Sequence, residues 1–258
     1  MDLKAVLFAV ALTLSPVWSE ADTYVLVHGA FQDATIWFLV AERLEAAGHD
    51  VVTVDLPGRD ATGAAAEVSL DAYIGAVGAV VQAQETPVIL VGHSFGGMTI
   101  TGVADRHPDN IAKLIFVAAY VPVTGESMED LALSDSDNAF TQETFVIADD
   151  YSHASILPED QVRVFAQDAN DAQAAALQAS MVREPFAPIG TPLALTGAGG
   201  DVPMAYIRTL ADRTVSTPLQ TRMIERAAIA TVADIDTGHA PYLTQPAVLA
   251  DLILMVSD

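Results

Sequence analysis

The stretch Val91-Gly92-His93-Ser94-Phe95-Gly96-Gly97 decides the fold, because a serine between glycines directly follows an apolar run and opens a helical pattern. The run before it, Pro87 to Val91, is short and rich in β-branched residues, as a strand buried in a parallel sheet requires. A sharp strand-to-helix turn strains its central residue, and small neighbours at Gly92 and Gly96 permit that turn. We therefore expect the Ser94 hydroxyl at the carboxyl end of a strand, where ligands bind in open α/β sheets.

Short apolar runs alternate with amphipathic stretches from Asp22 onward, and this pattern predicts a mostly parallel sheet with helices on both faces. The predicted strands are Tyr24 to Val27, Asp50 to Asp55, Pro87 to Val91, Ile111 to Ala118, Ala205 to Leu210 and Ala230 to Ile235. The predicted helices are Ala34 to Ala47, Ser69 to Gln84, Phe95 to Arg106, Thr217 to Ala227 and Pro246 to Val256. Residues 22–258 are thus expected to form one α/β domain.

The stretch from about residue 122 to residue 192 breaks this rhythm, because acidic residues, Gln and Ala dominate it and no apolar run is as clean as its neighbours. We interpret it as a lid inserted into the domain, with a helix over the alanine-rich piece Asn170 to Ser180. Its aromatic side chains either line an apolar pocket or simply pack the lid. These side chains are Phe140, Phe145, Tyr151, Phe165 and Phe186.

Composition excludes several classes of partner and chemistry. The 11 basic and 34 acidic side chains give a formal charge of −23, which repels phosphate backbones and anionic lipid and so disfavours nucleic acid as a partner. The chain has no cysteine, which rules out disulfides, thiolate metal sites and a cysteine nucleophile. Covalent catalysis would therefore need another nucleophile. We expect the protein to be a monomer or a homodimer.

The first 21 residues are interpreted as a signal peptide. An apolar run from Ala5 to Val17 follows Lys4, and Ser19-Glu20-Ala21 fits the small-x-small rule for cleavage. The run is too short to span a bilayer comfortably, so we expect export to the periplasm or the medium without lasting membrane insertion. A lipid-facing anchor and a misassigned start codon are the alternatives.

A serine hydroxyl becomes a nucleophile only when a base removes its proton, so a histidine is needed elsewhere in the chain. Of six histidines, His239 follows the last predicted strand and is expected at the same sheet edge as Ser94. His28 and His93 stand at strand ends and are expected to hydrogen-bond around the site. The remaining three, His49, His107 and His153, are expected to have no role there, and no spacing resembles a metal cluster.

The base needs an acid that fixes its tautomer. In α/β folds with a serine at such a strand-to-helix turn, the acid lies between the serine and the histidine in chain order. Asp212 follows a predicted strand and is the first choice. Asp201 precedes that strand, and Asp234 and Asp236 end the last one, so these alternatives approach the imidazole from less suitable places.

Acyl transfer also needs N–H donors for a developing oxyanion, commonly the amide after the nucleophile and one from the loop after an earlier strand. These amides would belong to Phe95 and Ala30. Ala30 stands in His28-Gly29-Ala30-Phe31, directly after the first predicted strand, where glycine allows the backbone to approach closely.

With these motifs the chain from Thr23 onward resembles the α/β-hydrolase branch that contains plant methylesterases, hydroxynitrile lyases and related bacterial esterases. The segments that carry the resemblance are Val27-His28-Gly29-Ala30, Asp55-Leu56-Pro57-Gly58, Gly92 to Gly97, Tyr206-Ile207-Arg208 with Asp212, and Gly238-His239. The lyases of that branch have a threonine after the first histidine and a lysine after the catalytic one. This sequence has Gly29 and Ala240 there, which favours the esterase side.

The resemblance implies a serine carboxylesterase that cleaves a small to medium ester through an acyl-enzyme, without a metal or cofactor. The implied catalytic residues are Ser94, His239 and Asp212. Hydroxynitrile cleavage, lactone or amide hydrolysis and perhydrolysis use the same triad, so the fold alone does not separate them. A binding protein that retains the pocket without turnover is the non-enzymatic alternative.

Overall fold

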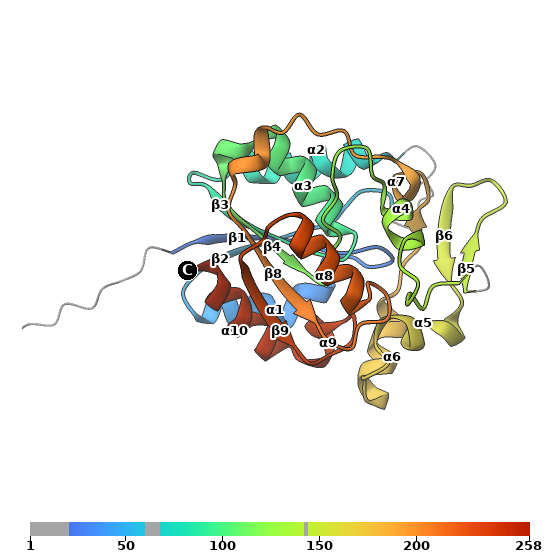
Figure 1. Ribbon diagram of the computed structural model, residues 1–258. Helices are drawn as coiled ribbons and strands as arrows, with labels where there is room; N and C mark the ends of the chain where they lie inside the picture. Colours follow the sequence, from blue (N-terminus) through green and yellow to red (C-terminus); the bar gives the residue numbers. More distant parts are fainter. Residues whose placement is uncertain (1–20, 60–67, 142–143) are drawn as a thin grey trace, which may run out of the picture.

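The centre of the molecule is a six-stranded parallel sheet in the order β2-β1-β3-β4-β8-β9 (Figure 1). The computed structural model describes residues 21–59, 68–141 and 144–258. The strands are β1 (Thr23–Val27), β2 (Asp50–Val54), β3 (Val88–His93), β4 (Ile111–Val117), β8 (Met204–Thr209) and β9 (Thr231–Ile235). All six predicted strands are present to within two residues at each end, and the predicted α/β class with a parallel central sheet is confirmed.

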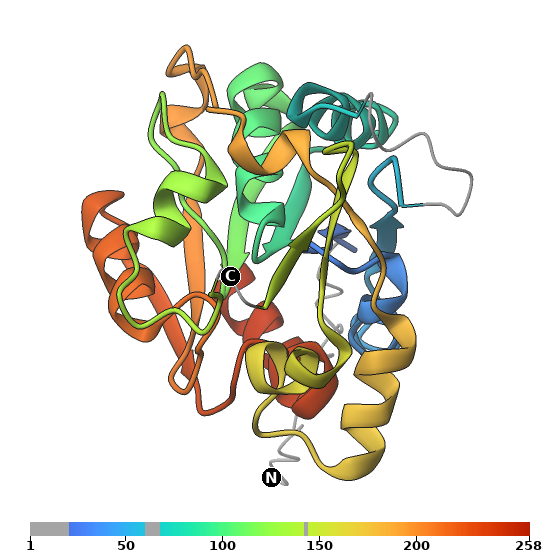
Figure 2. The ribbon, with the colours of Figure 1, turned by 90° about the vertical axis from the view of Figure 1, so that its right-hand side faces the viewer.

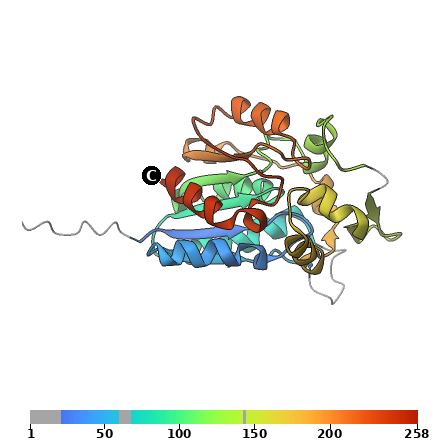
Figure 3. The same ribbon diagram turned by 90° about the horizontal axis from the view of Figure 1, so that it is seen from below.

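Helices cover both faces of this sheet. They are α1 (Phe38–Ala46), α2 (Leu70–Gln82), α3 (Gly96–Arg106), α8 (Thr217–Arg226), α9 (Pro241–Thr244) and α10 (Pro246–Ser257), with 3₁₀ turns η1 (Ala34–Trp37), η3 (Pro108–Asn110) and η4 (Ala198–Asp201). Helices α1 and α10 pack together on the face that Figure 3 views, and α2 and α3 pair on the opposite face. Every residue of β3 is buried, which explains its nearly unbroken apolar sequence.

The segment of residues 122–192, which lies between β4 and β8, is placed at the carboxyl edge of the sheet (Figure 2). It contains α4 (Met128–Leu133), β5 (Phe145–Ile147), β6 (His153–Ile156), α5 (Pro158–Phe165), α6 (Asp171–Ser180), β7 (Glu184–Pro185) and α7 (Ala187–Gly190). Helix α6 begins one residue after the start predicted for it. The antiparallel sheet β5-β6-β7 was not predicted, because strands of two to four residues are too short for an alternating pattern to show.

The turn between β3 and α3 has the strained geometry predicted for it. Ser94 adopts a positive φ of 54°, a conformation that is uncommon for a residue other than glycine. A Cβ on Gly96 would lie 2.8 Å from the carbonyl oxygen of His28, and one on Gly97 would lie 2.1 Å from that of Tyr120. Only glycine fits at these positions, so α3 packs directly against the ends of β1 and β4.

Across the three described ranges, no helix is both long and apolar enough to cross a membrane. Residues 1–20 of the predicted signal peptide lie outside the described residues, and the leader therefore stays a prediction.

Candidate active site

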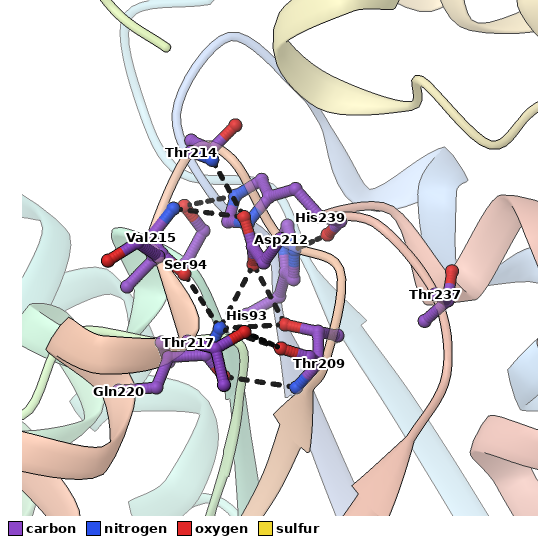
Figure 4. A network of polar contacts seen from close by, with 12 residues as sticks. His93, Ser94, Thr209, Asp212, Thr214, Val215, Thr217, Gln220, Thr237 and His239 are labelled. Atoms are coloured by element: carbon purple, nitrogen blue, oxygen red, sulfur yellow. Dashed lines mark hydrogen bonds and ion pairs between the residues drawn. The ribbon is translucent and has the colours of Figure 1, made fainter. Parts of the chain in front are cut away.

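Three loops at the carboxyl edge bring Ser94, His239 and Asp212 into one hydrogen-bonded chain (Figure 4). Ser94 follows β3, Asp212 follows β8 and His239 follows β9. The Ser94 hydroxyl donates to His239 Nε2 at 2.9 Å, and His239 Nδ1–H donates to Asp212 Oδ2 at 2.8 Å. With its proton held at Nδ1, the imidazole keeps Nε2 free to accept the serine proton.

The Asp212 carboxylate is fixed on both of its oxygens. Oδ1 accepts the backbone N–H groups of Thr214 at 2.7 Å and Val215 at 3.0 Å. Oδ2 accepts the Thr209 hydroxyl at 2.8 Å and, at 3.3 Å, the Gln220 side-chain amide from α8. Hydrogen bonds on both oxygens hold the orientation of this carboxylate toward His239.

The alternative acids lie elsewhere in the structure. Asp234 on β9 forms an ion pair with Arg208 on β8 at 2.9 Å, and Asp201 ends the 3₁₀ turn η4 before β8. Of the acids considered, Asp212 is the one with a hydrogen bond to His239 among the described residues.

His93 holds the loop that carries His239. Its Nε2–H donates to the main-chain carbonyl of His239 at 2.8 Å, and the centres of the two imidazole rings are 4.7 Å apart. Burial lowers the pKa of His93 well below its usual range, and a positive charge on the neighbouring His239 would lower it further. His93 therefore stays neutral beside the His239 imidazole.

His28 holds the loop after β1 in the same way. Its Nδ1–H donates to the Gly29 carbonyl at 2.9 Å, and its Nε2 accepts the Leu56 amide at 3.1 Å. Complete burial, with a smaller contribution from the charge of Arg59, lowers the pKa of His28 to about 3. The Gly29 carbonyl shares its peptide plane with the Ala30 N–H and points the opposite way. His28 thus orients the amide that the sequence predicts as an oxyanion donor.

The two predicted oxyanion amides have no hydrogen-bond partner among the described residues. Neither the Ala30 N–H nor the Phe95 N–H is bonded, although the neighbouring Phe31 amide is. A Cβ on Gly29 would lie only 2.8 Å from Ser94 Cβ, so this loop passes directly beside the serine. Two unpartnered amides near a buried hydroxyl provide the donors that an oxyanion needs.

A largely apolar pocket of about 460 Å³ opens onto Ser94. It is lined by Ala30, Phe31, Ser94, Tyr120, Met128, Glu129, Ala132, Leu133, Asn138, Phe140, Thr141, Phe145, Ile147, Phe165, Phe186, Ile189 and Thr214. Four of the five aromatic side chains considered from the sequence are in this lining. The fifth, Tyr151, is 67% exposed and packs against Phe186 instead. No Lys or Arg belongs to the described lining, and the described residues hold no cluster of three metal-ligating side chains.

The two buried neutral histidines should make the fold sensitive to mild acid. The unfolded chain binds a proton on each near pH 6.5, whereas folded His28 and His93 do not until far lower pH, so stability is lost as pH falls below 6.5. We expect the free energy of unfolding to drop by about 2–3 kcal/mol between about pH 7.5 and 5.5, since each histidine contributes up to about 1.4 kcal/mol per pH unit.

Urea unfolding in about 0.5 M salt, which screens the surface charge, measures this drop above the range in which carboxyl groups titrate. Equal stability at the two pH values would contradict the assignment of both histidines as buried and neutral.

A strained serine, a histidine and a buried aspartate at the carboxyl edge of a parallel sheet define the type of site that α/β hydrolases use. The chain matches the family described as the alpha/beta hydrolase family over residues 24–252, and it belongs to that family.

Known proteins similar to this chain include a bacterial hydrolase and a plant esterase. A pyrethroid hydrolase of Sphingobium wenxiniae is 28% identical over 243 residues, covering 91% of this chain and 87% of that protein. Methylesterase 17 of Arabidopsis thaliana is 27% identical over 252 residues, with 90% of each chain covered. The crystal structure of a pyrethroid hydrolase from Sphingobium faniae superposes with a TM-score of 0.81 at 26% identity, covering 92% of this chain and 98% of that one.

Proposed function

We propose that this protein is a serine carboxylesterase that cleaves esters with a bulky apolar group through an acyl-enzyme on Ser94. The observation that carries the proposal is the hydrogen-bonded chain from Asp212 through His239 to Ser94, whose hydroxyl faces the apolar pocket. The names of the similar proteins, a pyrethroid hydrolase and methylesterases, support ester chemistry.

In the first half of the reaction, Ser94 Oγ attacks the ester carbonyl carbon while its proton passes to His239 Nε2. The carbonyl oxygen becomes an oxyanion that accepts the amides of Ala30 and Phe95. Asp212 stabilises the imidazolium that forms. His239 then gives its proton to the leaving alcohol as the carbon–oxygen bond breaks, which leaves the acyl group on Ser94.

In the second half, a water molecule attacks the acyl carbon and gives its proton to His239. The tetrahedral intermediate collapses, the acid leaves and the proton returns to Ser94 Oγ. The proton transfer between Ser94 and His239 uses a hydrogen bond that is already present at 2.9 Å, and no metal or cofactor is needed in these steps.

The pocket supports an apolar substrate of small to medium size. Five phenylalanines contribute to its wall, and a cavity of about 460 Å³ lies within the usual range for a small-molecule site. Burial of an aromatic or branched group against these apolar walls contributes about 25 cal/mol of binding free energy per Å² of apolar surface. We therefore propose esters with at least one aromatic or bulky alkyl group, on either the acyl or the alcohol side.

Hydroxynitrile cleavage has less support from this site. Ala240, which stands where the related lyases have a lysine, is fully buried. The described pocket lining offers no cation to stabilise a departing cyanide.

The test is a panel of substrates offered to the purified mature protein: p-nitrophenyl esters of increasing chain length, methyl esters of aromatic acids, a pyrethroid and mandelonitrile. We expect ester turnover that improves as the apolar group grows to fill the pocket. Cleavage of mandelonitrile without turnover of any ester would contradict the proposal. Export by a cleaved leader stays a separate proposal, and N-terminal sequencing of the secreted protein tests it.

A further inference from the structure

The loop that carries Ala30 is held by the inserted segment as well as by His28. Phe31 has a positive φ of 62°, a strained conformation for a bulky residue. Its N–H donates to Glu184 Oε2 at 2.9 Å, and its carbonyl accepts the Val182 N–H at 2.9 Å. Both polar backbone groups of this strained residue are therefore bonded to the segment at the start of β7.

Glu184 is a charged group in an unusual place. Its side chain is fully buried, and besides the Phe31 amide it accepts Arg59 Nη2 at 2.7 Å and the Tyr73 hydroxyl at 2.9 Å. A buried ion pair is weak evidence for a gain in stability, because desolvation of both charges offsets most of their attraction. The contact of Glu184 with the loop beside Ser94 indicates a different role.

Consecutive peptide planes explain how Glu184 acts on Ala30. His28 fixes the plane that joins Gly29 to Ala30, and Glu184 fixes the next plane, which joins Ala30 to Phe31. Because both peptide planes are held, the Ala30 N–H cannot rotate away from Ser94. In enzymes, a misplacement of about 1 Å in the reacting geometry can cost about 100-fold in rate.

We propose that Glu184 is a positioning residue for the oxyanion hole, acting through the Phe31 amide to hold the Ala30 N–H in place. The proposal rests on the proposed function in assuming that Ser94 is the nucleophile. In this proposal the inserted segment contributes to the chemical step as well as to the pocket wall.

Two substitutions separate the reach of the side chain from its charge. Glu184→Asp keeps the negative charge beside Arg59 but withdraws the carboxylate from the Phe31 amide by one methylene. Glu184→Gln keeps the reach and an acceptor oxygen but loses the charge. The matched control is Glu126→Asp, because Glu126 also accepts one backbone amide, that of Val123 at 2.9 Å, and pairs with an arginine, Arg226 at 2.6 Å.

The measurement is the second-order rate at which a fluorophosphonate probe labels Ser94, taken on proteins whose folding is verified by circular dichroism. This reaction uses the oxyanion hole and does not depend on knowing the natural ester. We expect labelling to slow by about 10- to 100-fold in Glu184→Asp and to stay within about threefold of wild type in Glu184→Gln and Glu126→Asp.

The reverse pattern, with Glu184→Asp as fast as wild type and Glu184→Gln slow, would show that only the charge matters and would overturn the proposal. Equal rates in all folded variants would overturn it as well. Rapid wild-type labelling without turnover of any ester contradicts the esterase and leaves the comparison of the Glu184 variants valid. A wild-type protein that does not label at all overturns both proposals.

Discussion

Replacing Ser94 by alanine should lower kcat by about 10⁴-fold or more while leaving the fold intact. In the proposed mechanism this hydroxyl is the nucleophile, and without it neither the acyl-enzyme nor the proton transfer to His239 can occur. Among the described residues its side-chain hydrogen bond is to His239 alone, and alanine removes a single oxygen. Release of p-nitrophenol from an ester accepted by the wild type measures kcat, and thermal unfolding measures the effect on stability.

The control for the Ser94 variant is a second serine-to-alanine change at Ser180, whose hydroxyl donates to a carbonyl of its own helix α6 at 3.0 Å and has no other partner in the described parts of the chain. That variant should keep wild-type turnover. If the Ser94 variant retained activity within tenfold of wild type, another residue would have to be the nucleophile.

Asp212→Asn should lower kcat by about 10³- to 10⁴-fold, the second largest effect that we expect. An amide in place of the carboxylate donates to His239 Nδ1 instead of accepting from it. The imidazole proton then moves to Nε2, and the serine loses its acceptor. Turnover measured against pH checks this effect, because a wrong tautomer lowers the plateau of the profile, and thermal unfolding of the same variant separates it from general damage.

Asp234→Asn provides the matched control for Asp212→Asn. This aspartate was an alternative acid from the sequence, and it pairs with Arg208 at the surface. The variant should lose at most about 1 kcal/mol of stability and none of the turnover. Comparable activity losses in both variants would show that Asp212 has no special part in the reaction.

The sheet and the three central residues could be predicted because their signals are local. Buried parallel strands such as β3 need continuous apolar runs, and a serine between glycines at the end of such a run specifies the turn. In this fold an acid and then a histidine follow later strands, which predicts Asp212 and His239. The structure places these two side chains within hydrogen-bonding distance of each other.

Long-range pairing could not be predicted from local patterns. Arg59 and Glu184 are 125 residues apart, and nothing in the residues beside either one signals a buried pair. Gln220 likewise lies in an ordinary amphipathic helix, α8, and only the fold turns it toward Asp212. The small sheet β5-β6-β7 depends on contacts within the inserted segment, since strands this short have little intrinsic preference.

The proposed mechanism requires that an acyl group is transferred to Ser94. The direct measurement is mass spectrometry of the protein acid-quenched during turnover of a slowly deacylated ester, followed by peptide mapping of the adduct. We expect the acyl group on the peptide that contains Ser94, and no adduct in the Ser94→Ala variant. Turnover with the acyl group on another residue, or an unchanged adduct in that variant, would contradict the proposed mechanism.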